Sequence, residues 1–242
     1  MDLKKIVLVL GMHRSGTSSL MGTLEELGLF IGNANSKSIH NKKGNKEIPL
    51  FRQFHDKILK ENSANWMNPK IVNDWTNENI EELRNYIKSE FTNHEIWGLK
   101  DPRIVYLLKG WFNVIPKKKI IFITSIRHPL SVANSLLKRG NVKSIKEGLI
   151  IWRKYNHRIL KLSEKFQILY IDFDGNPEKN SKITYNIYQK LIEQPLKSNL
   201  TFFNNTLVNT KFEKDECPPA LKDLYQKLII KCKNTEMEFL NL

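Results

Sequence analysis

Residues 6–27 constrain the fold of this chain more than any other stretch, because three distinct patterns follow one another without a break. Residues 6–10 are a continuous aliphatic run, which predicts a strand buried on both faces of a parallel sheet. A loop containing two glycines comes next. Apolar residues then recur at helical spacing and stop before Gly28, which predicts a helix over residues 17–27. A strand, loop and helix in this order present backbone N–H groups to an anion.

The rest of the chain alternates aliphatic runs with helical patterns. Further strands are expected at residues 96–99, 120–126 and 168–171. Helices are expected at residues 48–59, 74–91, 105–112, 132–139 and 146–166, and after Pro218 and Pro219. This alternation predicts a three-layer α/β fold, with a central parallel sheet and helices on both faces. Without internal repeats or a long Pro/Gly/Ser linker, residues 1–242 are expected to form one domain.

The chain is strongly basic, with 39 Lys and Arg against 25 Asp and Glu, a net charge of +14. That excess suits a polyanionic partner, such as a nucleotide with several phosphates, an acidic glycan, nucleic acid or an anionic membrane. A solvated surface explains the scattered lysines, such as those at 117–119, equally well. Charge alone therefore does not decide the function.

Cysteine content and hydropathy bear on the compartment. Cys217 and Cys232 are the only cysteines and form no CxxC pattern, so we expect no metal site and no disulfide framework. The aliphatic run at residues 6–10 is too short for a signal peptide or a membrane span. We therefore expect a cytoplasmic chain that does not span a membrane.

Residues 11–18, Gly-Met-His-Arg-Ser-Gly-Thr-Ser, form the predicted anion loop. Gly16 permits close approach of the backbone, and the start of the helix adds unpaired N–H groups and a positive dipole end. Three hydroxyl side chains supply further donors, and Arg14 presents a planar guanidinium to phosphate or sulfate oxygens. The candidate ligands of this loop are Arg14, Ser15, Gly16, Thr17 and Ser18.

A nucleoside-triphosphate loop is the first alternative, since the glycine spacing matches GxxxxGK[ST]. Thr17 stands where that motif requires lysine, and the strand at 120–126 runs into Arg127 rather than an aspartate for Mg²⁺. Asp172 does follow a later strand. A P-loop small-molecule kinase therefore stays open, as does a tight turn without a ligand.

A second basic group follows the strand at 120–126. Arg127 comes at the end of that strand, where α/β sheets collect ligands. Pro129 fits the first turn of the next helix, in which Ser135 and Arg139 share a face. Arg127, Ser135 and Arg139 are expected to converge on one phosphate, with a solvated helix turn as the alternative.

Together these segments resemble PAPS-dependent sulfotransferases. Residues 14–18, Arg-Ser-Gly-Thr-Ser, look like their 5′-phosphosulfate loop, particularly in the branch of tyrosylprotein and bacterial carbohydrate sulfotransferases. Arg127 with a serine eight residues later is similar to their 3′-phosphate site, and Arg139 matches an arginine of the tyrosylprotein enzymes. The resemblance implies a P-loop-like phosphosulfate-binding loop and 3′-phosphoadenosine 5′-phosphosulfate (PAPS) as co-substrate. The product is then 3′,5′-bisphosphoadenosine, and no metal is required.

The segment Lys100-Asp101-Pro102 resembles the Lys-Asp-Pro segment of tyrosylprotein sulfotransferases, in which the lysine stabilises the leaving group. In cytosolic small-molecule sulfotransferases a histidine base stands at the position of Pro102. The base of this chain must therefore come from elsewhere. For Asp101 we favour a capping role at the start of the next helix.

We prefer Glu47 as the catalytic base, because relatives in the bacterial branch carry a glutamate at this point after a glycine and aromatic residues. This chain keeps the glutamate and lacks the aromatics. A helix-start glutamate that interacts with the dipole is the alternative. His55 and His40 are the next candidates for the base. Tyr170 resembles the tyrosine that many sulfotransferases place near adenine or the 3′-phosphate, with an ordinary core tyrosine as the alternative.

The resemblance thus implies an enzyme that transfers a sulfuryl group from PAPS to an acceptor hydroxyl, with Glu47 and Lys100 catalytic. A saccharide is the expected acceptor, because the bacterial branch commonly sulfates sugars and the early loop lacks aromatics for phenols or steroids. The expected partner is therefore a small molecule or saccharide and not a nucleic acid. A non-catalytic nucleotide- or glycan-binding protein on the same fold remains an alternative beside the kinase.

Overall fold

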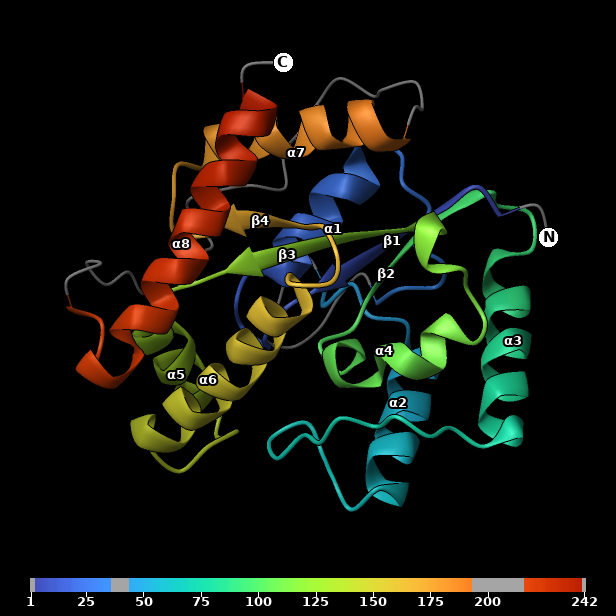
Figure 1. Cartoon of the computed structure of the whole chain (residues 1–242), viewed down its shortest axis with the longest axis horizontal. Coiled ribbons are helices and arrows are strands. Elements are labelled where there is room, and N and C mark those ends of the chain that lie inside the picture. Colours follow the sequence, from blue (N-terminus) through green and yellow to red (C-terminus); the bar gives the residue numbers. More distant parts are fainter. Residues whose placement is uncertain (1–2, 36–43, 193–215, 241–242) are drawn as a thin grey trace.

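The computed structural model describes residues 3–35, 44–192 and 216–240. The described elements form one parallel sheet flanked by helices (Figure 1). The strands are β1 (Lys5–Leu10), β2 (Ile96–Lys100), β3 (Ile120–Ile126) and β4 (Ile168–Asp172). The helices are α1 (Thr17–Glu26), α2 (Pro49–Glu61), α3 (Asn77–Phe91), α4 (Ile104–Phe112), α5 (Pro129–Lys138), α6 (Ile145–Leu162), α7 (Pro177–Ile192) and α8 (Pro219–Leu240), with a 3-10 turn at Lys117–Lys119.

The described strands are all parallel and lie in the order β2-β1-β3-β4. Val9 pairs with Lys100 in β2, and Ile126 at the end of β3 pairs with Asp172 at the end of β4. The carboxyl ends of the strands therefore meet at one edge of the sheet. The predicted anion loop, the turn after Lys100 and Arg127 all follow strands at this edge, which is where α/β sheets bind ligands.

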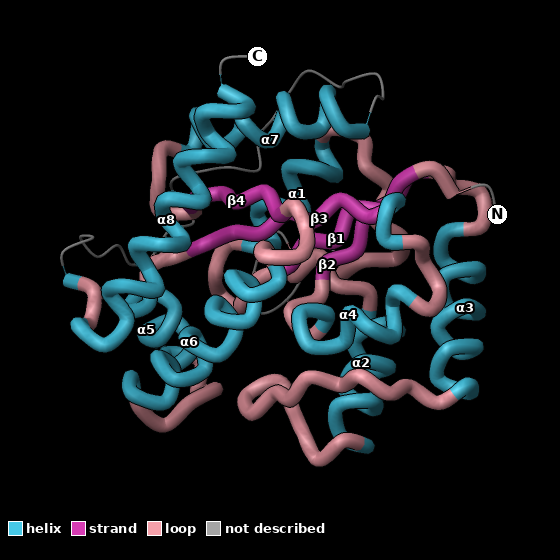
Figure 2. The backbone as a smooth tube through the Cα atoms, in the orientation of Figure 1, coloured by secondary structure: helices cyan, strands magenta, loops and turns pink. Residues whose placement is uncertain are grey.

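Alternate side chains of each strand pack into two separate cores, one on each face of the sheet. Val7 and Val9 of β1 pack with α1 and α7, whereas Ile6 and Leu8 pack with the helices of the other face, α2 to α6. Figure 2 shows the strands between these two layers of helices. The expected three-layer α/β fold with a central parallel sheet is confirmed.

Helix α8 lies beside β4 at the edge of the sheet (Figure 1). Its residue Leu228 belongs to one core and its residue Phe239 to the other. The Thr235 hydroxyl accepts a hydrogen bond of 2.9 Å from the backbone N–H of Tyr170 in β4. A strand edge with unpaired N–H groups can recruit other chains, and α8 covers part of this edge.

Most predicted elements are present within a few residues, and the differences have local causes. The helix expected at 74–91 begins only at Asn77, because the Thr76 side chain caps it by accepting a hydrogen bond from the N–H of Asn79. The helix expected to reach residue 166 ends at Leu162, and Phe166 instead packs against Phe122 of β3. Within the described ranges no helix is both long and apolar enough to cross a membrane.

Candidate functional site

The loop between β1 and α1 turns at residues with left-handed backbone. Gly11 has φ +142° and Gly16 has φ +86°, and a Cβ on Gly16 would lie 2.0 Å from the Phe173 ring, so only glycine fits there. Arg14 also has a positive φ, of 69°. Left-handed residues in such a turn are typical of backbone nests, which aim successive N–H groups at an anion.

The groups of this loop fit a bound phosphate or sulfate. Helix α1 begins at Thr17 without a side-chain cap from Gly16. The N–H of Ser19 bonds the Gly16 carbonyl at 2.9 Å, so the N–H groups before Ser19 are the ones that can face a ligand. The Ser15 hydroxyl is buried and has no hydrogen-bond partner within the described residues. The Ser15 carbonyl accepts a hydrogen bond of 2.7 Å from the Ser125 hydroxyl, which holds the loop against β3. A buried hydroxyl without a partner costs free energy that a bound oxyanion would recover.

The second basic group lies directly against this loop. Arg14 Nε donates to Ser135 Oγ of α5 at 2.8 Å, and Arg127 Nη1 donates to the Arg14 carbonyl at 3.2 Å. The structure thus brings the two predicted anion sites together, and the Arg14 side chain is directed toward Ser135. Arg139 directly follows α5 and acts electrostatically on Arg14.

The arginines of this group perturb one another. Burial, together with the charges of Arg139 and Arg127, lowers the pKa of Arg14 to about 10. Burial also lowers the pKa values of Arg127 and Arg139. Guanidinium groups crowded in this way favour a bound anion that neutralises them.

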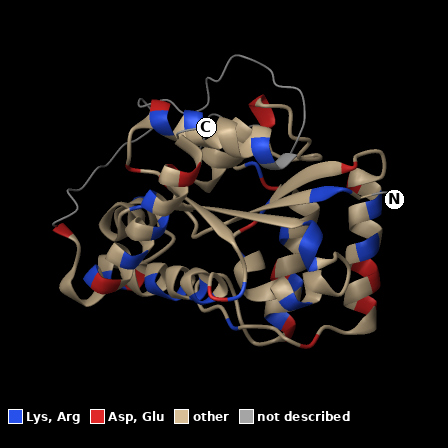
Figure 3. Cartoon of the chain, turned by 45° about the horizontal axis from the view of Figure 1, so that its top comes forward, with Lys and Arg blue, Asp and Glu red and all other residues tan. Residues whose placement is uncertain are grey.

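Elsewhere Lys and Arg are spread over helices on both sides of the sheet, as expected for a partly solvated basic surface (Figure 3).

Lys100 and Glu47 form a buried ion pair on the other side of the loop. Lys100 Nζ lies 2.5 Å from Glu47 Oε1 and 3.1 Å from the Asn45 carbonyl. It also lies 3.5 Å from the Ser18 hydroxyl at the start of α1. The predicted base and the predicted leaving-group lysine therefore meet beside the anion loop, although 53 residues separate them in the sequence.

Residues 44–47 are held in place by several contacts. The Ser18 hydroxyl donates to the Asn45 carbonyl at 2.9 Å, and Lys46 Nζ pairs with Glu25 of α1 at 2.6 Å. Lys46 has a left-handed backbone with φ 54°, and its N–H donates to the Asn35 carbonyl. The contacts of Asn45 and Lys46 tie the segment that carries Glu47 to helix α1.

The other candidates for the base have different outcomes. His55 is fully buried in α2, with Nδ1 2.9 Å from Asp101 Oδ2 and Nε2 accepting from Trp111 Nε1 at 3.1 Å. Both of its ring nitrogens are therefore engaged within the core. His40 lies outside the described residues. Asp101 Oδ1 accepts the N–H of Arg103 at 2.9 Å in the turn before α4. The expected capping role of Asp101 is not met, because Arg103 stands at the N-cap of α4 and this helix has no side-chain cap.

Tyr170 does not lie with the other predicted site residues. It belongs to a core cluster, is 1% exposed, and donates its hydroxyl to the Ile159 carbonyl of α6 at 3.4 Å. It stands two residues before the end of β4, so its side chain points into the layer of α6 rather than toward the ligand-binding edge of the sheet. The structure therefore agrees with the alternative of a core tyrosine.

Three residues near the site were not predicted from the sequence. Asp174 Oδ1 lies 3.5 Å from Arg127 Nε, while its Oδ2 accepts the N–H of His128 at 2.6 Å. The Phe173 ring lies 5.2 Å from the Arg127 guanidinium. The His13 ring lies in the loop, 4.7 Å from the Trp66 ring, and burial lowers the pKa of His13. The signal that could have pointed to Phe173 and Asp174 is an aromatic and an acidic residue directly after a buried strand.

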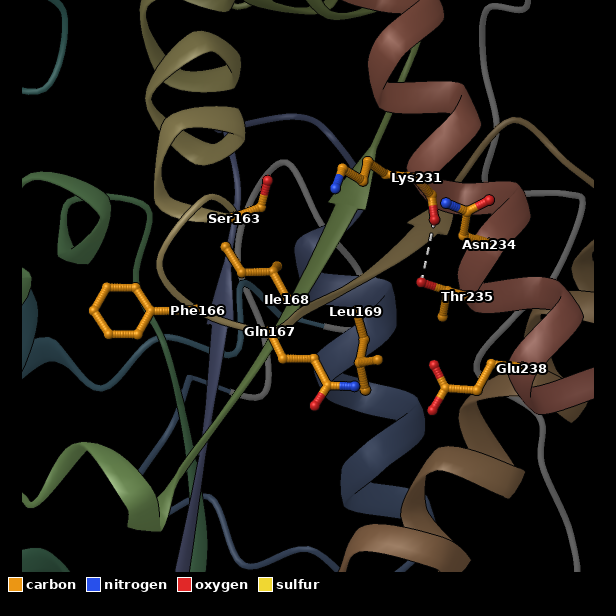
Figure 4. A pocket seen from close by; sticks show the side chains of 9 residues that line it. All are labelled: Ser163, Phe166, Gln167, Ile168, Leu169, Lys231, Asn234, Thr235 and Glu238. Carbon is orange, nitrogen blue, oxygen red and sulfur yellow. Dashed lines mark hydrogen bonds between the residues drawn. The ribbon is translucent and has the colours of Figure 1, made fainter.

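A pocket lies away from this site, at the start of β4 (Figure 4). It is lined by the turn between α6 and β4 and by α8 residues such as Lys231 and Asn234. Because it lies at the amino end of a parallel strand, it is on the edge opposite the one where such sheets bind ligands. In the part of the chain that the structure describes, no group of three or more His, Cys, Asp or Glu side chains is arranged to hold a metal ion.

Comparison with solved structures finds similar folds. The sulfotransferase domain of the Synechococcus PCC 7002 olefin synthase matches at 16% identity and a TM-score of 0.48, covering 99% of this chain and 95% of that chain. A sulfotransferase domain from the curacin biosynthetic pathway matches at 12% identity and a TM-score of 0.46, with 98% of each chain covered. No protein-family profile and no curated protein sequence matches the chain. The function must therefore be inferred from the residues of the chain itself.

Proposed function

We propose that the chain is a sulfotransferase that moves a sulfuryl group from PAPS to a saccharide hydroxyl, with residues 1–242 as a single domain. The observation that carries this proposal is the double contact of the loop after β1. Arg14 bonds Ser135 among the arginines, while Ser18 lies against Lys100 and its partner Glu47. One loop therefore contacts both the arginine group and the pair of Lys100 and Glu47, which supports the proposal.

The proposed donor site uses both sides of this loop. The N–H groups at the start of α1 and the loop hydroxyls hold the 5′-phosphosulfate. Arg127, Ser135 and Arg139 hold the 3′-phosphate. Arg14 belongs to the 5′-phosphosulfate side of the proposed site, and its hydrogen bond to Ser135 brings it against the residues proposed for the 3′-phosphate. A nucleotide with a 3′-phosphate would neutralise more of the crowded positive charge than ADP, whose phosphates are all on the 5′ side.

In the proposed reaction Glu47 accepts the proton of the acceptor hydroxyl as its oxygen bonds to sulfur. The bond between sulfur and the oxygen of the 5′-phosphate breaks, and that oxygen keeps the electron pair. Lys100, which lies beside Ser18 of the loop, stabilises the developing charge. The products are a sulfate ester and 3′,5′-bisphosphoadenosine, with the acceptor proton on Glu47.

A saccharide acceptor is consistent with the aromatic surface near the loop. Trp66 is half-buried against His13, and an indole ring offers a broad apolar face beside polar groups. We further propose that the reaction takes place in the cytoplasm, because Cys217 and Cys232 are buried and are not joined to each other by a disulfide.

The decisive experiment titrates 3′,5′-bisphosphoadenosine and ADP against the folded protein by calorimetry. We expect the bisphosphate to bind more tightly, and Arg127→Ala to weaken it by about tenfold to a hundredfold while affecting ADP far less. Arg153→Ala, at an exposed arginine of α6, is the matched control and should change neither affinity.

Other outcomes would contradict the proposal in different ways. Equal losses of affinity for both nucleotides in Arg127→Ala would show that Arg127 does not bind the 3′-phosphate. Tighter binding of ATP with Mg²⁺ than of the bisphosphate would favour a small-molecule kinase. The protein could also bind the bisphosphate and yet sulfate no member of a saccharide panel supplied with PAPS. That outcome would indicate a non-catalytic binding protein.

A further inference from the structure

The segment formed by Glu47 and helix α2 contacts the end of β2 and the turn that follows it at three successive points. Glu47, two residues before the helix, pairs with Lys100. Farther along, His55 bonds Asp101 and Asp56 pairs with Arg103. Residues 55 and 56 lie about two helical turns beyond the first residue of α2, roughly 10 Å along the axis. The same two segments are therefore joined at the proposed chemistry and again farther along α2.

Arg103 is the centre of the distant contact. Its Nε and Nη2 donate to the two carboxylate oxygens of Asp56 at 2.5 and 3.2 Å, and its Nη1 donates to Asp101 Oδ1 at 3.0 Å. Two-point pairing between a guanidinium and a carboxylate fixes the orientation as well as the separation of the two groups. Arg103 is 5% exposed and Asp101 is 1% exposed, so both charges depend on these partners.

His55 adds a directional hydrogen bond to the same cluster. The Trp111 indole N–H can only donate, so His55 Nε2 must accept. His55 Nδ1 then carries the hydrogen and donates a hydrogen bond to Asp101 Oδ2. Although burial opposes it, the Arg103 charge and this hydrogen bond hold the pKa of Asp101 well below its usual range. Although burial opposes it too, Asp101 and Asp56 raise the pKa of Arg103. Asp101 and Arg103 thus stay charged.

We propose that four positioning residues form a clamp that holds the Glu47 carboxylate against Lys100 Nζ. The clamp consists of His55, Asp56, Asp101 and Arg103. Lys100 and Asp101 are adjacent in the chain, and Glu47 lies two residues before α2. A rotation of α2 against the turn after β2 would therefore move the Glu47 carboxylate away from the lysine. The clamp prevents that rotation without contacting the reacting groups itself. This role rests on the proposed function of Glu47 and Lys100.

The experiment uses Asp56, because its side chain is 46% exposed and its replacement disturbs the core less than replacement of Arg103. Asp56→Asn keeps the shape and removes the charge. We expect kcat for sulfation to fall about tenfold or more while the affinity for 3′,5′-bisphosphoadenosine stays within about twofold, because misplacement by a fraction of an ångström lowers the rate and not the binding of the donor. Asp56→Glu restores the charge and should recover part of the loss.

Asp74→Asn is the matched control, since Asp74 is a fully exposed aspartate paired with Lys109 of α4 at 3.8 Å. It should leave kcat unchanged. An unchanged kcat in Asp56→Asn, an equal loss in Asp74→Asn, or parallel losses of rate and bisphosphate affinity would each overturn the clamp.

A second measurement separates this inference from the proposed function. Urea unfolding of Asp56→Asn, Glu47→Gln and the double variant tests the coupling between the clamp and the ion pair without any turnover. If the clamp places Glu47, the double variant loses less stability than the sum of the two single losses. Strictly additive losses would contradict the clamp even in an active enzyme, and coupled losses would support it even if no acceptor were sulfated.

Discussion

The pairing of Glu47 with Lys100 is the contact on which the proposed chemistry depends. Both side chains are nearly buried, and Lys100 has further contacts with Asn45 and Ser18. A buried ion pair is costly to break, because the remaining charge loses its partner in a poorly solvated place. The two residues therefore have to be tested with substitutions that keep a hydrogen bond between them.

Glu47→Gln is the substitution that fits this condition, since the amide oxygen can still accept from Lys100. We expect kcat to fall by a factor of about 10² to 10⁴, because glutamine cannot take the acceptor proton. Steady-state sulfation assays with PAPS measure the rate, and calorimetry should give an unchanged bisphosphate affinity. Glu81→Gln, at an exposed carboxylate of α3, serves as the control. An unchanged kcat in Glu47→Gln would show that another group is the catalytic base.

The junction of β1 and α1 shows how one element depends on another for its shape. Gly16 has a positive φ, and the Phe173 ring after β4 fills the space that a side chain would need. Gly140 also has a positive φ, of +68°, but nothing lies within 4 Å of its missing Cβ. These two glycines separate the cost of backbone conformation from the cost of crowding.

Gly140→Ala should lower the free energy of unfolding by about 1–2 kcal/mol, the cost of an L-residue in the left-handed region. Gly16→Ala should cost more, because its Cβ also meets Phe173, and it should weaken bisphosphate binding. Urea denaturation measures both losses. In a Phe173→Ala background the cost of Gly16→Ala should fall to that of Gly140→Ala. A cost that stays the same in both backgrounds would show that Phe173 does not crowd this position.

The molecule as a whole is held by two cores on either side of one sheet, and α8 joins them at the β4 edge. Leu228 and Phe239 place this helix in both cores. The Thr235 hydroxyl accepts a hydrogen bond from the backbone N–H of Tyr170. Asp174, which contacts Arg127, follows the same strand. The stability of this edge therefore supports the scaffold of the proposed 3′-phosphate site.

Thr235→Val should lower the free energy of unfolding by about 1–3 kcal/mol, because the buried N–H of Tyr170 loses its acceptor. Hydrogen exchange at the Tyr170 amide should accelerate, and urea denaturation should give the loss. Thr235→Ser keeps the hydroxyl and is the control. Bisphosphate affinity should not change, since Thr235 lies away from the ligand-binding edge. Slow exchange at Tyr170 in the valine variant would contradict this role of α8.

Local patterns in the sequence were enough to predict the strands, most of the helices and the two basic segments. Aliphatic runs, helical spacing, glycines and caps act over a few residues, so they can be recognised without knowing the rest of the fold. The strand expected at 120–126 agrees with β3, and the loop before Thr17 has the predicted glycine turn. The roles assigned to Arg14, Arg127 and Lys100 remain predictions of the same kind.

Contacts between distant segments depended on the order and register of the strands, which no local pattern encodes. Arg14 bonds Ser135 across 121 residues, and His55 bonds Asp101 across 46. Tyr170 illustrates the same point, because its place in β4 was predictable but the layer it faces was not. Short-range preferences thus determine the elements, whereas the partner of each charged side chain is settled only when the sheet brings the ends of its strands together.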